Sequence, residues 1–228
     1  MAGRGSASRG RKPAGATTAA PRHPAAASRT RPTAEPTAEP TGDQLDERVI
    51  DAALALAARD GWRAARLPAI AAEAGVGLAV LYHRFRDKPA ILAALVQRVD
   101  RAMLASGGDE PAEGSPRDRL FDVVMRRFET LQTMRPAITA IVAGVDPASA
   151  ARALCAGVRS LAWMLEAAGI DSAGLVGRLR IAGLAVVYAR AFRAWLDDEG
   201  ADLGKTMAAL DRGLALAERW AGALPVSR

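Results

Sequence analysis

Apolar residues that recur at helical spacing are the feature that most constrains how this chain can fold. Val49, Ile50, Ala53 and Ala57 repeat at intervals that place them on one face of a helix. Gly61 follows that run and suits the position just past a helix end. Alanine and leucine dominate the chain, aromatic residues make up only 4% of it, and no segment alternates apolar and polar residues as a half-buried strand does. The sequence therefore predicts an all-α fold.

Start and stop signals divide the rest of the chain into further helices. Proline shortly after serine or aspartate marks three starts, because proline is tolerated in the first turn while the preceding side chain caps the backbone. Gly75 and the pair Arg135-Pro136 interrupt the pattern, and Asp202 is expected to cap the last helix. The expected helices cover about 43–60, 67–74, 78–85, 88–103, 116–133, 136–144, 147–169, 172 or 174 to 198, and 202–222.

Composition divides the chain into parts. Residues 1–42 carry seven basic and two acidic side chains and several prolines, whereas the remainder has a net charge of only +1. Such a segment is typical of a disordered tail, which serves either as a solvated tether or as a basic arm that attracts phosphate. Residues 106–116 are rich in glycine, proline and acids, as linkers are. We expect a disordered basic tail over 1–42, a small helical domain over 43–105 and a larger one over 117–228.

Cysteine and histidine, which commonly serve as nucleophile, base or metal ligand, are scarce in this chain. The chain has one cysteine, Cys155, and two histidines, His23 and His83, so it has neither a disulfide framework nor a cluster spaced for a metal ion. It also lacks a glycine-rich loop that could hold phosphate. No uncharged apolar run reaches the roughly 18 residues of a membrane span, and the N-terminus has no continuous apolar stretch. We expect a cytoplasmic protein that is not an enzyme and uses no cofactor or metal.

The segment "AAEAGVGLAVLYHRFRDK" (71–88) predicts a helix-turn-helix at about 67–86. Two short helices flank a glycine corner, and the small residues Ala71 and Ala74 allow close packing near the turn. In such a motif the second helix enters the major groove of DNA while the first lies across the backbone. The alternative is two core helices joined tightly. The DNA-binding interpretation requires that the corner at 75–77 present the segment 78–83 outward.

Residues 47–104 resemble the DNA-binding domain of the tetracycline-repressor (TetR) family. The similarity rests on "RVIDAALALAARDGW", "IAAEAGVG" and "LYHRFRDKPAILAAL", in this order and at about the family's spacing. It implies an all-helical homodimer whose N-terminal domain binds double-stranded DNA and whose C-terminal domain pairs and binds a ligand. It further implies that Tyr82 and Lys88 contact phosphate, that Leu81 and Phe85 are core residues, and that Gly77, Leu78, Ala79 and His83 face the groove.

Several positions depart from the family's pattern. Gly77 and Arg66 stand where the family commonly has serine or threonine, and Arg84 stands where it commonly has histidine. The start of the groove-facing side offers no arginine, asparagine or glutamine, which read bases by paired hydrogen bonds, although apolar contact with thymine methyl groups remains available. Basic side chains would attract the backbone, which positions a protein without specifying sequence. The predicted DNA contacts are Arg66, Gly77, Leu78, Ala79, Tyr82, His83, Arg84 and Lys88, with backbone attraction also from Arg63 and Arg86.

A second resemblance covers "YARAFRAWLDDEGADLGKTMAALDRGLALAERW" (188–220). It is similar to the C-terminal segment of coenzyme Q biosynthesis accessory proteins in the spacing of one set of residues, namely Trp195, Asp197, Asp198, Asp202, Thr206, Leu210 and Asp211. That resemblance implies a lipid or isoprenoid ligand and a partner enzyme on a TetR-like fold, without DNA binding. From the residues alone, the alternative is ordinary helix capping and packing.

Bulky apolar residues on two long helices of the C-terminal part could line a pocket for a small hydrophobic effector or lipid. The alternative is a solid core between the helices. The candidates are Trp163, Leu184, Tyr188, Phe192 and Trp195. We expect a ligand-responsive TetR-type repressor that dimerises through its last two long helices; the alternative is a lipid-binding accessory protein on the same fold.

Overall fold

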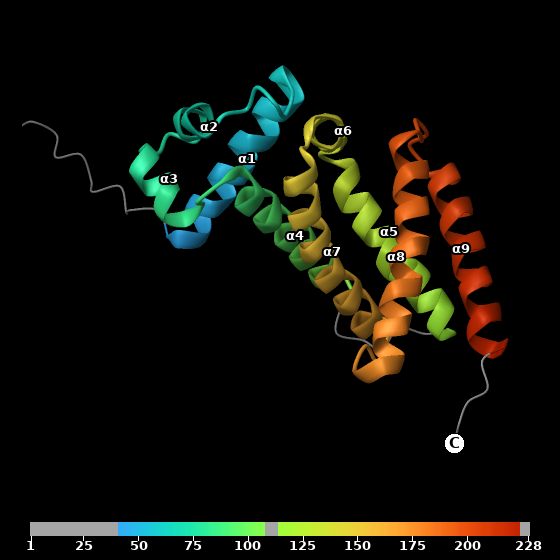
Figure 1. Ribbon diagram of the computed structural model, residues 1–228. Helices are drawn as coiled ribbons and strands as arrows, with labels where there is room; N and C mark the ends of the chain where they lie inside the picture. Colours follow the sequence, from blue (N-terminus) through green and yellow to red (C-terminus); the bar gives the residue numbers. More distant parts are fainter. Residues whose placement is uncertain (1–40, 108–113, 224–228) are drawn as a thin grey trace, which may run out of the picture. The chain divides into compact units, whose positions relative to one another are not determined.

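The computed structural model describes residues 41–107 and 114–223, which form nine α-helices and no strand (Figure 1). The all-α prediction is therefore confirmed. The predicted tail, except for residues 41 and 42, and most of the predicted linker lie outside the described residues. No helix in the described ranges is both long and apolar enough to cross a membrane. The helices are α1 (Gly42–Asp60), α2 (Leu67–Glu73), α3 (Leu78–Arg84), α4 (Lys88–Ala105), α5 (Pro116–Gln132), α6 (Arg135–Gly144), α7 (Pro147–Ala167), α8 (Gly174–Leu196) and α9 (Gly204–Ala223).

Local capping signals set the starts of α4, α5 and α7 at the predicted positions. The Asp87 carboxylate accepts a hydrogen bond from the Ala90 N–H at 2.9 Å, and Asp146 accepts one from the N–H three residues on, at 3.0 Å. Ser115 and Asp118 form a reciprocal capping box. A proline lies in the first turn of each of these helices. Sequence and structure agree here because each cap lies next to the helix that it starts.

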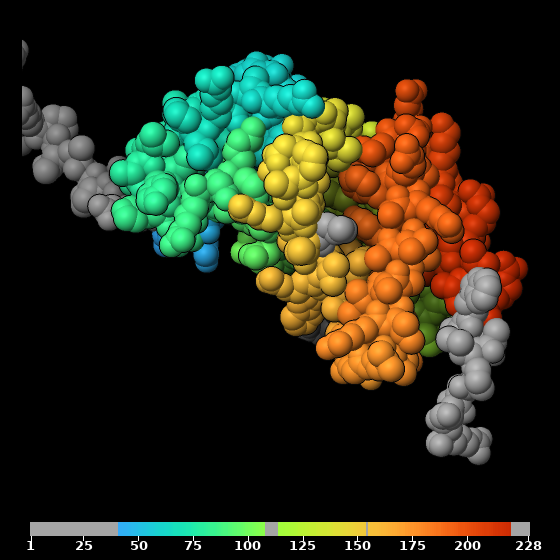
Figure 2. Space-filling model, viewed as in Figure 1, coloured from blue at the N-terminus to red at the C-terminus, as the bar shows by residue number. Residues whose placement is uncertain are grey.

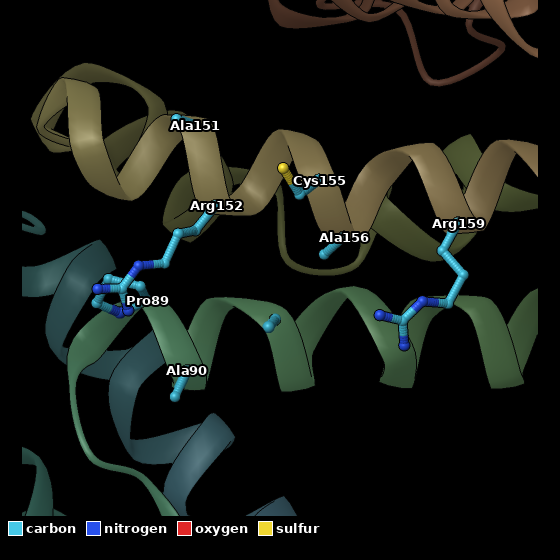
Figure 3. Close-up of a pocket in the computed structure, with 8 residues that line it drawn as sticks. Pro89, Ala90, Ala151, Arg152, Cys155, Ala156 and Arg159 are labelled. Carbon is cyan, nitrogen blue, oxygen red and sulfur yellow. The ribbon is translucent and has the colours of Figure 1, made fainter.

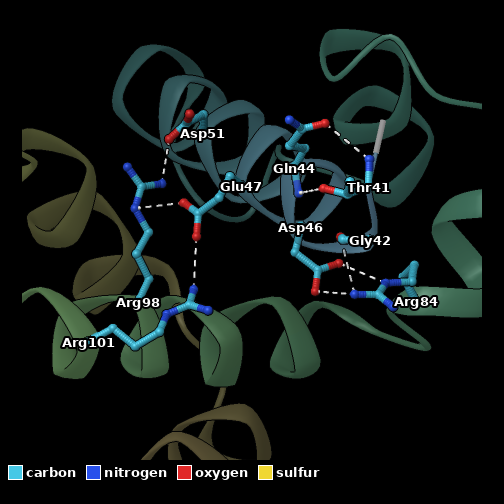
Figure 4. A network of polar contacts seen from close by, with 9 residues as sticks. All are labelled: Thr41, Gly42, Gln44, Asp46, Glu47, Asp51, Arg84, Arg98 and Arg101. Carbon is cyan, nitrogen blue, oxygen red and sulfur yellow. Dashed lines mark hydrogen bonds and ion pairs between the residues drawn. The ribbon is translucent and has the colours of Figure 1, made fainter. Parts of the chain in front are cut away.

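The acidic residues near the start of α1 hold this helix to its neighbours. The cap of α1 is Thr41, whose side chain accepts a hydrogen bond from the Gln44 N–H. The carboxylates that follow form ion pairs with arginines of α3 and α4 (Figure 4). The pairs are Asp46–Arg84, Glu47–Arg98, Glu47–Arg101 and Asp51–Arg98. One side of α1 is therefore attached to the end of α3 and to the C-terminal half of α4.

α4 lies at the centre of the packing. It contacts α1, α5 and α7, while α1 also contacts α6, and α9 contacts both α5 and α8. The buried side chains of these helices form one continuous hydrophobic core. The helices on either side of the predicted linker share this core, so the core does not mark a boundary between two domains. The division into 43–105 and 117–228 stays a prediction.

Candidate nucleic-acid interface

The turn between α2 and α3 is fixed by an arginine from α1. Gly75 has a φ of 64°, a left-handed conformation that glycine adopts at little cost. The Arg48 guanidinium donates hydrogen bonds to the carbonyl oxygens of Ala74 and Gly75 at 2.6 and 3.3 Å. The carbonyl groups of the α2 C-cap and of the turn that follows therefore have a charged partner. Sequence reasoning assigned no role to Arg48, because it lies 26 residues before Ala74.

The short helix α3 has a buried and an exposed side. Leu81 and Phe85 are buried in the core, as predicted. On the other side Leu78, Val80 and Tyr82 are 52%, 46% and 63% exposed, and Ala79 and His83 are exposed as well. In Figure 2, α3 (green) forms part of the molecular surface beside α2. The glycine corner therefore presents 78–83 outward from this chain, as the helix-turn-helix interpretation requires.

Two of the predicted phosphate contacts are engaged inside the protein. Arg84 Nε donates to the Asp46 carboxylate at 2.8 Å, and this hydrogen bond raises the pKa of Arg84 (Figure 4). The Lys88 ammonium donates to the carbonyl oxygen of Trp62 and lies 4.2 Å from the centroid of that residue's ring. Burial lowers the pKa of Lys88. Both cations therefore brace the hairpin against α1 and the turn that follows α1.

Three other arginines of the hairpin region are exposed. Arg63 and Arg66 lie between α1 and α2, and Arg86 lies between α3 and α4; within the described chain their side chains have no ion-pair partner. Arg66 is the N-cap of α2 and Gly77 is the N-cap of α3, and neither provides a side-chain cap. Both helices thus lack the hydroxyl cap common in the family that the hairpin resembles, while Arg66 remains available as a charge.

The predicted pocket in the C-terminal part is filled by packed side chains. Tyr188, Phe192 and Trp195 stack in succession on α8, with neighbouring ring centroids 6.1 and 5.5 Å apart. Leu184 and Trp195 are buried. Trp163 lies outside this stack, on α7, with 52% of its surface exposed. This packing agrees with the alternative of a solid core, because the same helical spacing serves a core and a pocket equally well, and the ligand pocket at these residues stays a prediction.

A cavity of about 410 Å³ lies instead between α4 and α7 (Figure 3). Arg152 at its rim also forms an ion pair with Asp87, the cap of α4. Because Asp87 closely follows α3, the cavity adjoins the connection between the hairpin and the remaining helices. The lining residues are Pro89, Ala90, Ala93, Ala151, Arg152, Cys155, Ala156 and Arg159.

The residues behind the second resemblance have structural partners. The buried Asp198 carboxylate accepts hydrogen bonds from the N–H and the O–H of Thr206, both at 2.9 Å. Burial acts to raise the pKa of Asp198, but these hydrogen bonds outweigh it, and the pKa lies below its ordinary value. Asp202, the predicted cap of α9, accepts only a longer hydrogen bond of 3.4 Å from Gly204. Asp198 is therefore the principal partner of the first turn of α9, and capping accounts for these polar positions of the motif.

A row of apolar side chains is exposed along α8. Leu175, Val176, Leu179 and Val186 are between 52% and 75% exposed and recur at spacings that place them on one face of the helix. The exposed apolar surface of α7 includes Trp163, whereas the last helix, α9, offers a smaller exposure at Leu216, 37%. Exposed apolar surface of this kind marks interaction sites more often than chance.

Comparisons with known proteins bear on the hairpin and on the fold. Residues 49–95 match the family "Bacterial regulatory proteins, tetR family". A TetR transcriptional regulator from Nitrosomonas europaea has a similar structure, with a TM-score of 0.61, 27% identity, and coverage of 77% of this chain and 98% of that chain. A TetR regulator from Rhodococcus sp. RHA1 aligns with a TM-score of 0.59, 22% identity, and coverage of 76% and 96%. No curated protein matches the chain.

These findings support a TetR-type transcriptional regulator and agree with the expectation that the protein is not an enzyme. They do not confirm the resemblance of residues 188–220 to coenzyme Q accessory proteins. The described chain has the all-helical TetR fold, and its residues 49–95 match the model of the N-terminal domain of the TetR family of bacterial regulatory proteins.

Proposed function

We propose that this protein is a cytoplasmic, ligand-responsive repressor of the TetR type, which binds double-stranded DNA as a homodimer. The observation that supports it best is the outward side of α3, where Leu78 and Tyr82 are exposed while Leu81 anchors the helix in the core. Insertion into a major groove needs a helix whose inner side is packed on the core and whose outer side is exposed.

The exposed arginines around α3 are the proposed phosphate contacts. Arg63 and Arg66 precede α2, and Arg86 follows α3, so they lie at the ends of the hairpin's helices. The phenol of Tyr82 is exposed and adds a hydrogen-bond donor on the outer side. Arg84 and Lys88 are assigned instead to bracing, because both are engaged with groups of this chain.

The dimer is proposed to form through the exposed apolar face of α8. The sequence suggested the last two long helices, α8 and α9, but the larger exposed apolar side chains lie on α8 and α7, including Leu175 and Trp163. Burial of this face by the same face of a second copy removes apolar surface from water on both sides. The two copies of α3 would then meet successive major grooves, about 34 Å apart.

The effector site is proposed at the cavity between α4 and α7. Its apolar floor and the guanidinium groups of Arg152 and Arg159 suit a small hydrophobic molecule with an anionic group. A ligand there would separate α7 from α4 and weaken the Asp87–Arg152 ion pair beside α3. Repression would be relieved if the ligand binds better to the form in which the two copies of α3 are wrongly spaced.

A binding selection on random duplex DNA at two salt concentrations tests the proposal. We expect enrichment of a near-palindromic site, and a loss of affinity for many sequences alike in Tyr82→Ala and Arg86→Ala. Arg212→Ala, an exposed arginine on α9, is the matched control and should leave affinity unchanged. Absence of enrichment, with affinity that collapses at higher salt, would contradict the proposal. Co-purification of an isoprenoid with a protein indifferent to these changes would support the lipid-binding alternative instead.

A further inference from the structure

The exposed side of α3 is unusual in the chemistry that it offers to a base. Its first turn exposes only apolar side chains, Leu78, Ala79 and Val80. The exposed side chains with hydrogen-bonding groups, Tyr82 and His83, come in its second half. The remaining polar residue of the helix is Arg84. Its guanidinium group donates hydrogen bonds to the Asp46 carboxylate and, at 3.2 Å, to the carbonyl oxygen of Gly42.

This arrangement separates two tasks that one arginine often performs together. An arginine or glutamine in the first turn would read a base by two hydrogen bonds, and the first turn of α3 has neither residue. The exposed arginines outside the helix, Arg66 and Arg86, contribute charge, which does not distinguish one base from another. Discrimination by the start of α3 must therefore come from apolar contact.

The major groove presents one apolar group to such a surface, the 5-methyl group of thymine. The other base edges there carry hydrogen-bonding groups, and covering these with Leu78 would leave them without a partner. An apolar first turn consequently favours a thymine methyl by its own burial. Cytosine has only a hydrogen at the same ring position, and its neighbouring 4-amino group is left without a partner by an apolar side chain.

We propose that the DNA site of this protein is recognised chiefly through thymine methyl groups that pack against Leu78 and Ala79. This inference rests on the proposed function and specifies what the same surface reads. Leu78, with 52% of its surface exposed, is the principal residue for this specificity, because its side chain is the largest apolar group of the first turn that reaches solvent.

The test replaces thymine by uracil, which differs only in lacking the methyl group, within the site enriched from random DNA. Single replacements at each thymine of a half-site are compared for the full-length protein, for Leu78→Ala and for Leu104→Ala. Leu104, on α4, is also an exposed leucine, with 39% of its surface accessible, and serves as the matched control.

We expect one or two replacements per half-site to weaken binding of the unchanged protein about fourfold each, the effect of exposing one buried methyl group. Leu78→Ala should reduce that penalty to less than twofold, whereas Leu104→Ala should keep it. The dependence of affinity on salt should be the same for thymine and uracil, because no phosphate contact changes.

The outcomes separate the inference from the function on which it rests. An enriched site that tolerates uracil at every position, or one without thymine, would overturn methyl recognition and leave DNA binding standing. A penalty that Leu78→Ala does not reduce would also overturn the role of Leu78. If no site is enriched, the proposed function itself fails, and the inference with it.

Discussion

At the scale of single residues, Arg84 and Arg86 lie two positions apart at the end of α3, yet they have different surroundings. Arg84 is paired with Asp46 of α1, while Arg86 is exposed and has no ion-pair partner within the described residues. The side chain of Arg84 is itself 40% exposed, so water screens the pair and limits its contribution to stability. The two arginines should therefore respond differently to the same substitution.

We expect Arg84→Ala to lower the free energy of unfolding by roughly 0.5–1 kcal/mol, because the ion pair and its contact with α1 are lost. The affinity of Arg84→Ala for DNA should depend on salt concentration as the affinity of the unchanged protein does. Arg86→Ala should leave stability within about 0.5 kcal/mol and reduce the slope of log affinity against log salt by about one. Urea unfolding and DNA titrations at several salt concentrations measure both quantities. The assignment is wrong if Arg84→Ala reduces the slope as Arg86→Ala does.

At the scale of helices, much of the fold could be predicted from the sequence, because most helix starts depend on neighbouring residues. Asp87 and Asp146 cap helices that begin directly after them. What could not be predicted were partners brought together by folding, such as Arg84 with Asp46, 38 residues apart. The partner at the start of α9 could not be predicted for the same reason, although it is closer in the sequence. Asp198 accepts a hydrogen bond from Thr206 across a turn in which Leu203 has a φ of 54°.

The candidate site divides in the same way. The exposed and buried sides of α3 followed from the resemblance and from apolar spacing, and Leu81 and Phe85 are buried as expected. The pocket could not be settled from the sequence, because spacing alone does not tell a stack of aromatic rings from a lined cavity. The exposed fraction of each side chain in the structure separates Trp163, which is exposed, from Leu184 and Trp195, which are buried.

The cap of α9 gives a prediction that belongs to this scale. Asp198→Ala should lower the free energy of unfolding by about 1–2 kcal/mol at pH 7, because the Thr206 N–H and O–H lose a buried partner. The pKa of Asp198 is lower in the folded protein than its ordinary value, so its contribution is present at neutral pH and is lost as the pH falls below about 4.

Thermal unfolding at pH 7 and at about pH 3 checks this expectation, and the difference between Asp198→Ala and the unchanged protein should shrink at the lower pH. The neighbouring Asp197 is exposed and supplies the control, since Asp197→Ala should have little effect at either pH. An equal loss in both variants would point to a general helix-end charge effect and exclude the specific cap.

At the scale of the whole molecule, the exposed face of α8 and the exposed side of α3 depend on each other in the proposed function. One copy of α3 offers a small apolar and aromatic surface, and two copies joined rigidly read two half-sites with a fixed separation. Loss of the interface through α8 should therefore weaken DNA binding although α8 never touches DNA.

Leu179→Glu tests this dependence, because it places a carboxylate at the centre of the exposed apolar face of α8, where Leu179 is 59% exposed. A charge on an exposed site is tolerated by the monomer, whereas burial of an unpaired carboxylate between two copies is costly. We expect sedimentation to show a monomer with an unchanged helical circular dichroism spectrum, and binding to the full palindrome to fall to that of a half-site. Val142→Glu, on α6 and 43% exposed, should remain dimeric and bind normally. If Leu179→Glu still sediments as a dimer, the interface lies on another surface, and the spacing of the two copies of α3 must be set elsewhere.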